Sequence, residues 1–401
     1  MQTHAVAIAD GLHARGHEVR VLTYRPDSEA DACAVYDRTR PYPTRRVLGR
    51  LAIHASVRTV ADEVDRFRPD AVVASTTFFG ALVEARRVPV ICRSVGNDVM
   101  RCWVPYPFRF GSGLVGGERF ESVTLRLYRR LRAPTWIEDF LLARRREFVA
   151  GAARSATRVL ANSDYTRDRL LECGVDPTRI RLVVGGVDSA AFAPRPGNRP
   201  RDGQAPDGPR LLTACRLVAK KGLEVLLESA AIASRDAPGL TLTVVGDGPM
   251  RAAYEAEAAR VGLGGRVRFV GRVPHSKVRG YYHRADLFVL PSRPHVRKSG
   301  WTDVETMGRV LCEANAAGVP VIATWTGGVP SVIQHGANGW LVAAGDSGGL
   351  AEAIVRLWRD RSLRDALASE GLRRARSVFD WSAVLDAYER VLAEVTPPRR
   401  A

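Results

Sequence analysis

Residues 303–321 read DVETMGRVLCEANAAGVPV, and this stretch joins a candidate ligand site to the pattern of an α/β unit. The pattern predicts a helix that starts near Gly308 and ends at Gly318, followed by a buried strand. The first turn of such a helix offers unbonded N–H groups and the positive end of a dipole, which suit a phosphate. Glu305 before the helix and Glu313 about two turns along it would then reach hydroxyl groups on either side of that phosphate. A ligand with the layout sugar–diphosphate–ribose fits this pattern. The alternative is an ordinary βα unit whose two glutamates are solvated and bind no ligand.

A second motif follows the predicted strand Arg210–Ala214, where the chain continues as CRLVAKKG. Arg216 and Lys221 fall in a strand-to-helix loop, the place where ligands bind in open α/β sheets. Two fixed cations at that place can neutralise a diphosphate without a metal ion. The alternative is a pair of solvent-exposed loop cations.

Three weaker signals come in order along the same half of the chain. Residues 240–245 predict a strand that runs into the turn Gly-Asp-Gly-Pro at 246–249. Residues 267–274 predict a second strand and a Gly-Arg-Val-Pro turn, followed by a helix through residues 281–282 and the apolar run 285–292. The third signal is the loop Thr-Gly-Gly-Val-Pro at 326–330.

From residue 210 to about 396, these motifs, their order and their spacing resemble the retaining glycosyltransferases of family 4, including those similar to actinobacterial phosphatidylinositol mannoside mannosyltransferases. The resemblance implies an α/β protein of the GT-B fold, with two Rossmann-like domains that face a cleft. It further implies metal-independent transfer of a hexose-type sugar from a nucleoside diphosphate sugar to a hydroxyl acceptor, with retention of anomeric configuration. Lipid-linked, inositol, aminocyclitol and saccharide acceptors all stay open.

The resemblance also implies roles for individual residues. Arg216 and Lys221 would hold the diphosphate as it leaves, Glu305 would bind the sugar hydroxyls, and these three are the predicted catalytic residues. Glu313 would bind the ribose, main-chain groups near Arg272 and Val273 would contact the base, and amides near the helix start would bind the phosphate. The predicted donor-binding set is Gly246, Arg272, Val273, Met307, Gly308, Arg309, Val310 and Glu313. No second carboxylate is evident as a covalent nucleophile, so the leaving phosphate itself would take the acceptor's proton.

The acceptor side departs from the family. Family members often carry His-Gly in the loop after the strand predicted at residues 89–92, and this chain has Val95 where the histidine is expected. Arg93, Asn97 and Asp98 are the candidate polar contacts to the sugar or acceptor. Plain loop residues are the open alternative.

Length indicates two domains, because 401 residues are too many for one hydrophobic core. We expect an acceptor-side domain at 1–193, a Pro/Gly-rich linker at 194–209, a nucleotide-sugar domain at 210–378, and a C-terminal helix at 379–401 that packs back on the first domain. The chain opens on a predicted helix, a stop at Gly16 and a strand. Family members have a strand and a glycine-rich turn before this helix, and this sequence does not show them. Either the true start codon lies upstream, or this domain is shortened and closes its sheet differently.

The net charge of +17 favours an anionic partner but says nothing about fold. The arginine-rich segment 101–158 would lie on an anionic membrane or form a solvated face. The cysteines are widely spaced, and the sequence shows neither a signal peptide nor an apolar run of about 20 residues. We therefore expect a cytoplasmic protein, which would be peripheral at the inner face of the membrane if it binds lipid. We expect neither a cofactor nor a metal, although Asp303 and Glu305 form an Asp-x-Glu pair.

Two other function classes fit the sequence less well. A GT-B nucleotide-sugar epimerase needs acid/base groups, and His275, His283 and His295 look unsuited to that task. A basic nucleic-acid-binding protein lacks a helix-turn-helix, zinc or RNP signature, and the arginines are dispersed, so we expect no nucleic acid partner.

Overall fold

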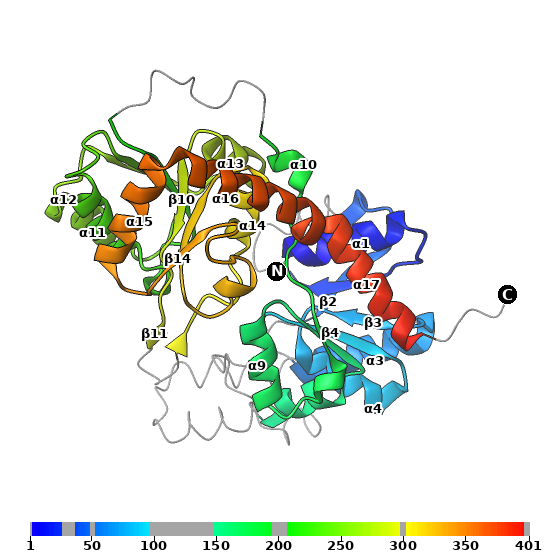
Figure 1. Cartoon of the computed structure of the whole chain (residues 1–401). Helices are drawn as coiled ribbons and strands as arrows, with labels where there is room; N and C mark the ends of the chain where they lie inside the picture. The colour runs from blue at the N-terminus through cyan, green and yellow to red at the C-terminus, as the bar shows by residue number, and fades with distance from the viewer. Residues whose placement is uncertain are drawn as a thin grey trace, which may run out of the picture. The chain divides into compact units, whose positions relative to one another are not determined.

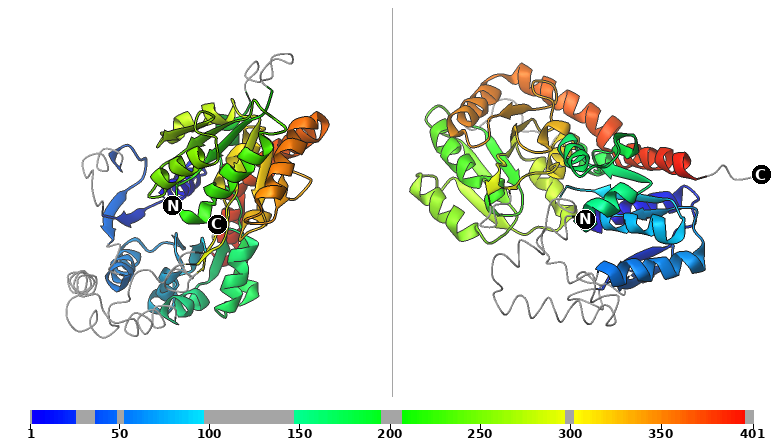
Figure 2. Two further views of the ribbon diagram at one scale, coloured as in Figure 1. Left: turned by 90° about the vertical axis from the view of Figure 1, so that its left-hand side faces the viewer. Right: turned by 90° about the horizontal axis from the view of Figure 1, so that it is seen from below.

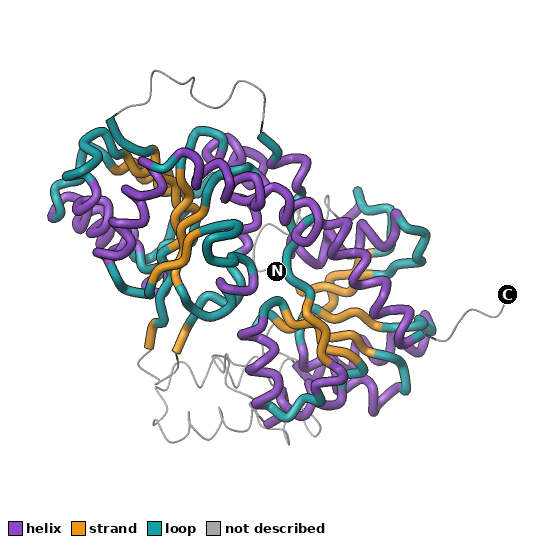
Figure 3. Tube along the Cα trace, viewed as in Figure 1, coloured by secondary structure: helices purple, strands orange, loops and turns teal. Residues whose placement is uncertain are grey.

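The computed structural model describes residues 2–25, 37–48, 53–96, 147–194, 207–296 and 302–396. Its contacts divide the chain into two compact units. Unit 1 comprises Met1–Val183 and Leu385–Ala401, and unit 2 comprises Val184–Val384. Both units are built on parallel strands, and Figure 3 shows helices packed against the strands of each unit.

Unit 2 is built on a parallel six-stranded sheet. Its strands are β7 (Arg210–Ala214), β8 (Thr241–Val245), β9 (Val267–Gly271), β10 (Leu287–Leu290), β13 (Val321–Thr324) and β14 (Trp340–Val342). They lie in the order β14-β13-β10-β7-β8-β9. The chain therefore moves outward from β7 to β9, returns to the other side of β7, and moves outward again. The point between β7 and β10 is the topological switch point, where open α/β sheets bind ligands beyond the carboxyl ends of the strands.

Both faces of this sheet are buried, because consecutive side chains of a strand point to opposite faces. In β7, Leu211 belongs to one hydrophobic core and Leu212 to the other. The first core is covered by α11 (Leu223–Ala233), α12 (Arg251–Arg260) and α15 (Ser347–Arg359), and the second by α13 (His275–Tyr282) and α14 (Arg309–Ala316). Figure 1 shows these two groups of helices on opposite sides of β10.

The remaining elements of unit 2 are short or peripheral. They are α10 (Ser189–Phe192), η3 (Ala219–Lys221), η4 (Val329–Ser331), α16 (Arg361–Arg374), η5 (Ala375–Phe379), and the antiparallel strands β11 (His295–Val296) and β12 (Thr302–Asp303). The strands β11 and β12 form the base of a hairpin directly before Glu305.

Unit 1 begins with the helix, glycine stop and strand that the sequence predicts. Helix α1 (Gln2–Ala14) is followed by Gly16 at φ +89° and by β1 (Val21–Tyr24). β1 pairs in parallel with β2 (Thr44–Leu48), and a separate parallel sheet has the order β3 (Val72–Ala74), β4 (Val90–Ser94), β5 (Arg158–Ala161), β6 (Ile180–Leu182). Side chains from both sheets join one hydrophobic core, which also receives α3 (Ile53–Phe67) and α4 (Leu82–Arg86). The other short elements are η1 (Thr77–Ala81), α9 (Asp164–Glu172) and η2 (Pro177–Arg179).

Helix α17 (Trp381–Val395) belongs to unit 1 from Leu385 onward. Its buried Tyr388 hydroxyl lies 3.1 Å from Nε2 of His4 in α1, and Arg15 reaches Asp386 at 2.7 Å. Near its end, Glu394 accepts hydrogen bonds from Arg158 and Arg181 at 2.9 and 2.8 Å. In Figure 2, α17 is the red helix that runs past the blue α1.

Most of the arginine-rich segment 101–158, for which a membrane contact and a solvated face are the two expectations, lies outside the described residues, which resume at residue 147. Among the helices that the structure does describe, each is too short or too polar to cross a bilayer.

Candidate functional site

The carboxyl end of β7 is joined closely to that of β10. Gly222 follows η3 and opens α11 at φ +62°, and a Cβ atom on it would lie 2.2 Å from the carbonyl oxygen of Pro291. Only glycine combines that left-handed backbone with such a close approach. The amide of Arg293 also donates to the carbonyl of Lys220 at 2.9 Å. The loops after the two central strands are thus fixed to one another at the switch point.

Lys221 lies at the end of the first of these loops and forms an ion pair with Glu305. Its Nζ donates to Oε2 of Glu305, and both side chains are nearly buried, at 13% and 11% exposure. Burial by itself would lower the pKa of Lys221, but Glu305, together with Cys215 and Asp303, outweighs it, and the net pKa is raised. Burial likewise opposes the charge of Glu305, but Lys221 and Lys220 hold its pKa below the ordinary value. Both partners are therefore charged at neutral pH.

A second lysine–carboxylate pair lies beside the first. Nζ of Lys220 is 2.9 Å from Oδ1 of Asp303 and 3.0 Å from the carbonyl oxygen of Val304. Asp303 is the last residue of β12 and its side chain is 4% exposed. Lys220 therefore ties the base of the β11–β12 hairpin to the loop after β7 and fixes the backbone immediately before Glu305.

Glu313 lies on α14 in a different set of contacts. Its side chain is 5% exposed, and its Oε2 accepts a hydrogen bond from the Tyr282 hydroxyl at 3.0 Å. Its Oε1 is 3.1 Å from Nε2 of His275 and 3.7 Å from Nε of Arg309. The hydrogen bond to Glu313 raises the pKa of His275, against the opposing effect of burial.

Between the two glutamates, helix α14 begins at the predicted place. Gly308 is its N-cap at φ +84°, and Arg309 is its first residue. The N–H group of Leu311 donates to the carbonyl oxygen of Gly308 at 2.9 Å, so the N–H groups of Arg309 and Val310 are the donors that this helix start offers to an anion. Met307 is buried in the second core of unit 2, and the carbonyl of Val310 lies 3.3 Å from the Tyr282 hydroxyl.

The other predicted donor residues of unit 2 lie at the same edge of the sheet. Arg216 is exposed after β7 and forms no ion pair with any residue that the structure describes. Gly246 directly follows β8, and its amide donates to the carbonyl of Gly271 at the end of β9. The next residues, exposed Arg272 and half-buried Val273, lead into α13.

The predicted acceptor-side residues belong to unit 1. Arg93 lies in β4 and is buried, with 8% exposure. Its positive charge lowers the pKa of the buried Tyr388, but burial is the larger effect and raises that pKa to about 12. Asn97 and Asp98 lie outside the described residues.

Across the described ranges, no three histidine, cysteine or carboxylate side chains gather in a way that would hold a metal ion. The two carboxylates of the Asp-x-Glu pair, Asp303 and Glu305, each bind a lysine instead.

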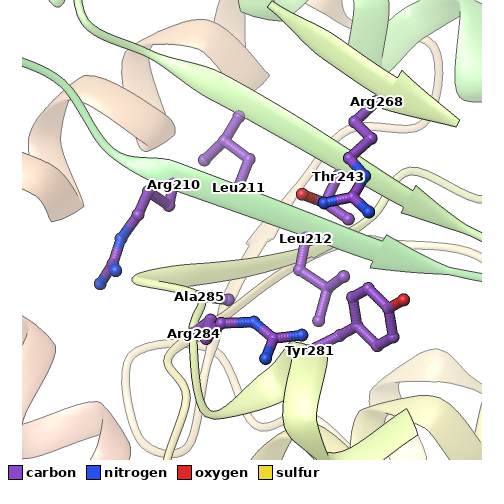
Figure 4. Close-up of a pocket in the computed structure, with 8 residues that line it drawn as sticks. All are labelled: Arg210, Leu211, Leu212, Thr243, Arg268, Tyr281, Arg284 and Ala285. Atoms are coloured by element: carbon purple, nitrogen blue, oxygen red, sulfur yellow. The ribbon is translucent and has the colours of Figure 1, made fainter. Parts of the chain in front are cut away.

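A cavity of about 120 Å³ lies elsewhere in unit 2, lined by Arg210, Leu211, Leu212, Thr243, Arg268, Tyr281, Arg284 and Ala285. Figure 4 shows Arg268, Arg284 and the ring of Tyr281 around Leu212. Arg210 is the first residue of β7 and is held by both oxygens of Asp286, at 2.9 and 2.8 Å. This cavity therefore lies toward the amino ends of the strands, away from the switch-point edge.

Three residues at the site are not predicted by the sequence pattern. The pattern gives Lys220 no role, makes His275 look unsuited as an acid or base, and places Tyr282 only in a helix. A signal existed for His275 and Tyr282, because they are seven residues apart and so lie on one face of a helix. Their common partner Glu313 belongs to another helix, which the local pattern does not reveal.

Two family models match the chain. The model described as Glycosyltransferase Family 4 matches residues 1–191, and the model described as Glycosyl transferases group 1 matches residues 195–374.

Individual relatives match over part of their length. The chain is 31% identical over 225 residues to the GDP-mannose-dependent alpha-(1-6)-phosphatidylinositol monomannoside mannosyltransferase of Mycobacterium tuberculosis, covering 55% of this chain and 58% of that protein. It is 34% identical over 266 residues to the D-inositol 3-phosphate glycosyltransferase of Frankia alni, covering 62% of this chain and 61% of that protein. The chain thus spans about three fifths of the length of these two relatives.

Among solved structures, Anabaena HepE in complex with UDP-glucose is similar with a TM-score of 0.68 and 20% identity, over 97% of this chain and 94% of that one. At this identity the similarity establishes the fold, and it agrees with the two α/β units described above.

Proposed function

Because the chain belongs to the family 4 glycosyltransferases, with a group 1 domain in its second half, we propose that it transfers a sugar from a nucleoside diphosphate sugar to a hydroxyl group of an acceptor. One observation carries this proposal. The buried Lys221–Glu305 pair lies at the switch-point edge of unit 2, directly before the N-terminus of α14.

The diphosphate would bind between the first turn of α14 and the two cations of the loop after β7. Arg216, which has no ion-pair partner among the described residues, supplies an uncompensated positive charge. Lys221 supplies a second positive charge, which Glu305 partly compensates. Charge on the leaving diphosphate grows as the bond to the sugar breaks, so fixed cations stabilise the transition state more than the ground state.

Glu305 would accept hydrogen bonds from hydroxyls of the transferred sugar while it remains bound to Lys221. Its lowered pKa keeps it an acceptor across the neutral range. In the transfer step, the bond from the anomeric carbon to the phosphate oxygen breaks and a bond to the acceptor oxygen forms on the same face. The acceptor's proton passes to the departing phosphate oxygen, and no metal ion takes part.

The names of the relatives suggest the acceptor class. The Mycobacterium tuberculosis protein is named for a phosphatidylinositol monomannoside and the Frankia alni protein for an inositol phosphate. We propose an acceptor hydroxyl on an inositol or a saccharide, and a lipid-linked acceptor would suit a chain of net charge +17 near anionic lipid.

A donor screen followed by product analysis tests the proposal. UDP- and GDP-linked hexoses are compared for the rise in Tm that ligand binding causes by mass action. The stabilising donor is then incubated with inositol phosphate, phosphatidylinositol and oligosaccharides. We expect transfer with an α-linked product from an α-linked donor, read by proton NMR of the anomeric signal. Inverted product would overturn retention, and conversion of the donor sugar without transfer would indicate an epimerase.

A further inference from the structure

Glu313 has its two carboxylate oxygens occupied by different kinds of partner. Oε2 is bound by the hydroxyl of Tyr282, and Oε1 by the ring of His275. Since the proposed function gives Glu313 the donor's ribose, hydroxyls of that ribose have to reach one of these oxygens.

The contact with Tyr282 cannot readily give way. Tyr282 is fully buried, and its ring packs against Phe192 and Phe288 with centroids 5.7 and 5.3 Å away. Burial and the nearby charge of Glu313 raise its pKa well above the ordinary value, so it stays a hydrogen-bond donor at any physiological pH. Oε2 therefore lies on the buried side of the carboxylate, against Tyr282.

The contact with His275 is of the opposite kind. His275 is the first residue of α13, and its side chain is 57% exposed whereas that of Glu313 is 5% exposed. An exposed ring at a helix start can change rotamer at little cost. Oε1 is thus the oxygen that a ligand from solvent can reach, once the imidazole moves aside.

We propose that His275 is a positioning residue that occupies Oε1 of Glu313 in the absence of donor and is displaced by the donor's ribose, so that its protonation controls donor affinity. The inference rests on the proposed function. It adds a residue that competes with the ribose for Glu313. A residue that bound the ribose directly would instead strengthen donor binding.

The charges around His275 determine the direction of the pH effect. Glu313 faces the ring from α14 and raises its pKa, Arg309 of the same helix lowers it, and the facing ring of Phe192 from α10 is uncharged. A protonated imidazole binds the carboxylate more strongly than a neutral one. Donor binding should therefore be weaker below the raised pKa of His275 and stronger above it, with release of a proton on binding.

Calorimetric titration with an intact nucleotide sugar, UDP-glucose and GDP-mannose in parallel, tests this. The diphosphate of such a donor has no group that titrates between pH 6 and 8, so any pH dependence belongs to the protein. We expect wild-type affinity to fall about threefold or more from pH 8 to pH 6. His275→Gln should bind more tightly at pH 6 than wild type and show a flat profile. His283→Gln is the matched control, because His283 is the C-cap of the same helix and contacts the carbonyl of Phe192, and no carboxylate of the described part of the chain binds it.

Three outcomes are separable. If His275→Gln weakens binding at every pH, His275 is a ligand of the ribose and the inference is wrong. The inference is equally wrong if the pH profiles of His275→Gln and wild type coincide. If neither nucleotide sugar binds to wild type, the proposed donor class itself fails. As a second measure, NMR titration of the His275 ring should show its pKa falling when donor is bound, and a rise would contradict displacement.

Discussion

The ammonium group of Lys221 is bound to the carboxylate of Glu305, a residue 84 positions later in the chain. The pair joins the loop after β7 to the segment before α14, and both groups keep their charge although both are nearly buried. A buried pair of this kind is costly to break on one side, because the remaining charge has no compensation. Arg216, in the same loop, is exposed and forms no such pair with any residue in the described ranges.

Arg216→Ala and Lys221→Ala should therefore differ in stability but resemble each other in activity. Each should lower kcat by roughly a hundredfold, about 3 kcal/mol, because both cations stabilise the leaving diphosphate. Only Lys221→Ala should also lower the free energy of unfolding. Steady-state kinetics and urea unfolding measure the two effects, with exposed Lys277→Ala on α13 as the control. Full turnover in both variants would remove the diphosphate assignment.

A double-mutant cycle isolates the ion pair itself. Lys221→Met alone should cost about 3 kcal/mol of unfolding free energy, and adding Glu305→Gln should restore a large part of it, since the unpaired buried charge is then gone. The lowered pKa of Glu305 also sets a pH dependence. Its contribution is present above its ordinary pKa of 4.5 and is lost as the pH falls through the lower, folded-state value. The double variant should show less acid sensitivity than wild type; additive losses at all pH values would contradict the coupling.

The two glutamates should separate by the part of the donor that each binds. Glu305→Gln should reduce kcat strongly while free UDP or GDP still binds, because the sugar is absent from those ligands. Glu313→Gln should weaken binding of the free nucleoside diphosphate through the ribose. Calorimetry with UDP and GDP compares the two variants, and equal losses of affinity would refute this division of roles.

Chelation with EDTA tests whether sugar transfer depends on a metal ion. Transfer should proceed at an unchanged rate in excess EDTA, because Lys220 and Lys221 already compensate Asp303 and Glu305. Activity that disappears with EDTA and returns with Mg²⁺ or Mn²⁺ would assign these carboxylates to a metal.

Gly327 and Gly336 both have positive φ, at +49° and +75°, but differ in what surrounds them. A Cβ on Gly327 would lie 2.0 Å from the carbonyl oxygen of Glu305, whereas a Cβ on Gly336 meets nothing within 4 Å. Gly336→Ala should cost only the backbone strain, about 1–2 kcal/mol, and leave activity intact. Gly327→Ala should cost more and reduce donor binding, because the backbone of Glu305 has to move. Thermal unfolding and donor titration measure both, and equal behaviour would mean that the position of Glu305 tolerates displacement.

Local signals predicted the elements of unit 2 well. The strand expected at 210–214 is β7 itself, and Gly308 and Gly318 bracket α14 as expected, because apolar periodicity and glycine placement are local properties. The fold class followed from the order of these elements and is confirmed by the fold comparisons.

Contacts between elements could not be predicted in the same way. Lys220 meets Asp303 and His275 meets Glu313 only after separate strands and helices have packed, so no short window of sequence contains either pair. The assigned roles of the site residues, the domain boundaries and the absence of a metal stay predictions. Asn97 and Asp98 fall outside the residues that the structure describes.

The strand order of unit 2 also bears on how this part of the chain can fold during synthesis. Each later strand of the six-stranded sheet is added at an outer edge, first β8 and β9 on one side, then β10, β13 and β14 on the other. No strand has to insert between two that are already paired, so the sheet can grow as the chain leaves the ribosome. Lys221 emerges well before Glu305 and spends that interval without its carboxylate partner. Nascent chains that end before β12 should therefore hold a sheet core but not yet the donor site.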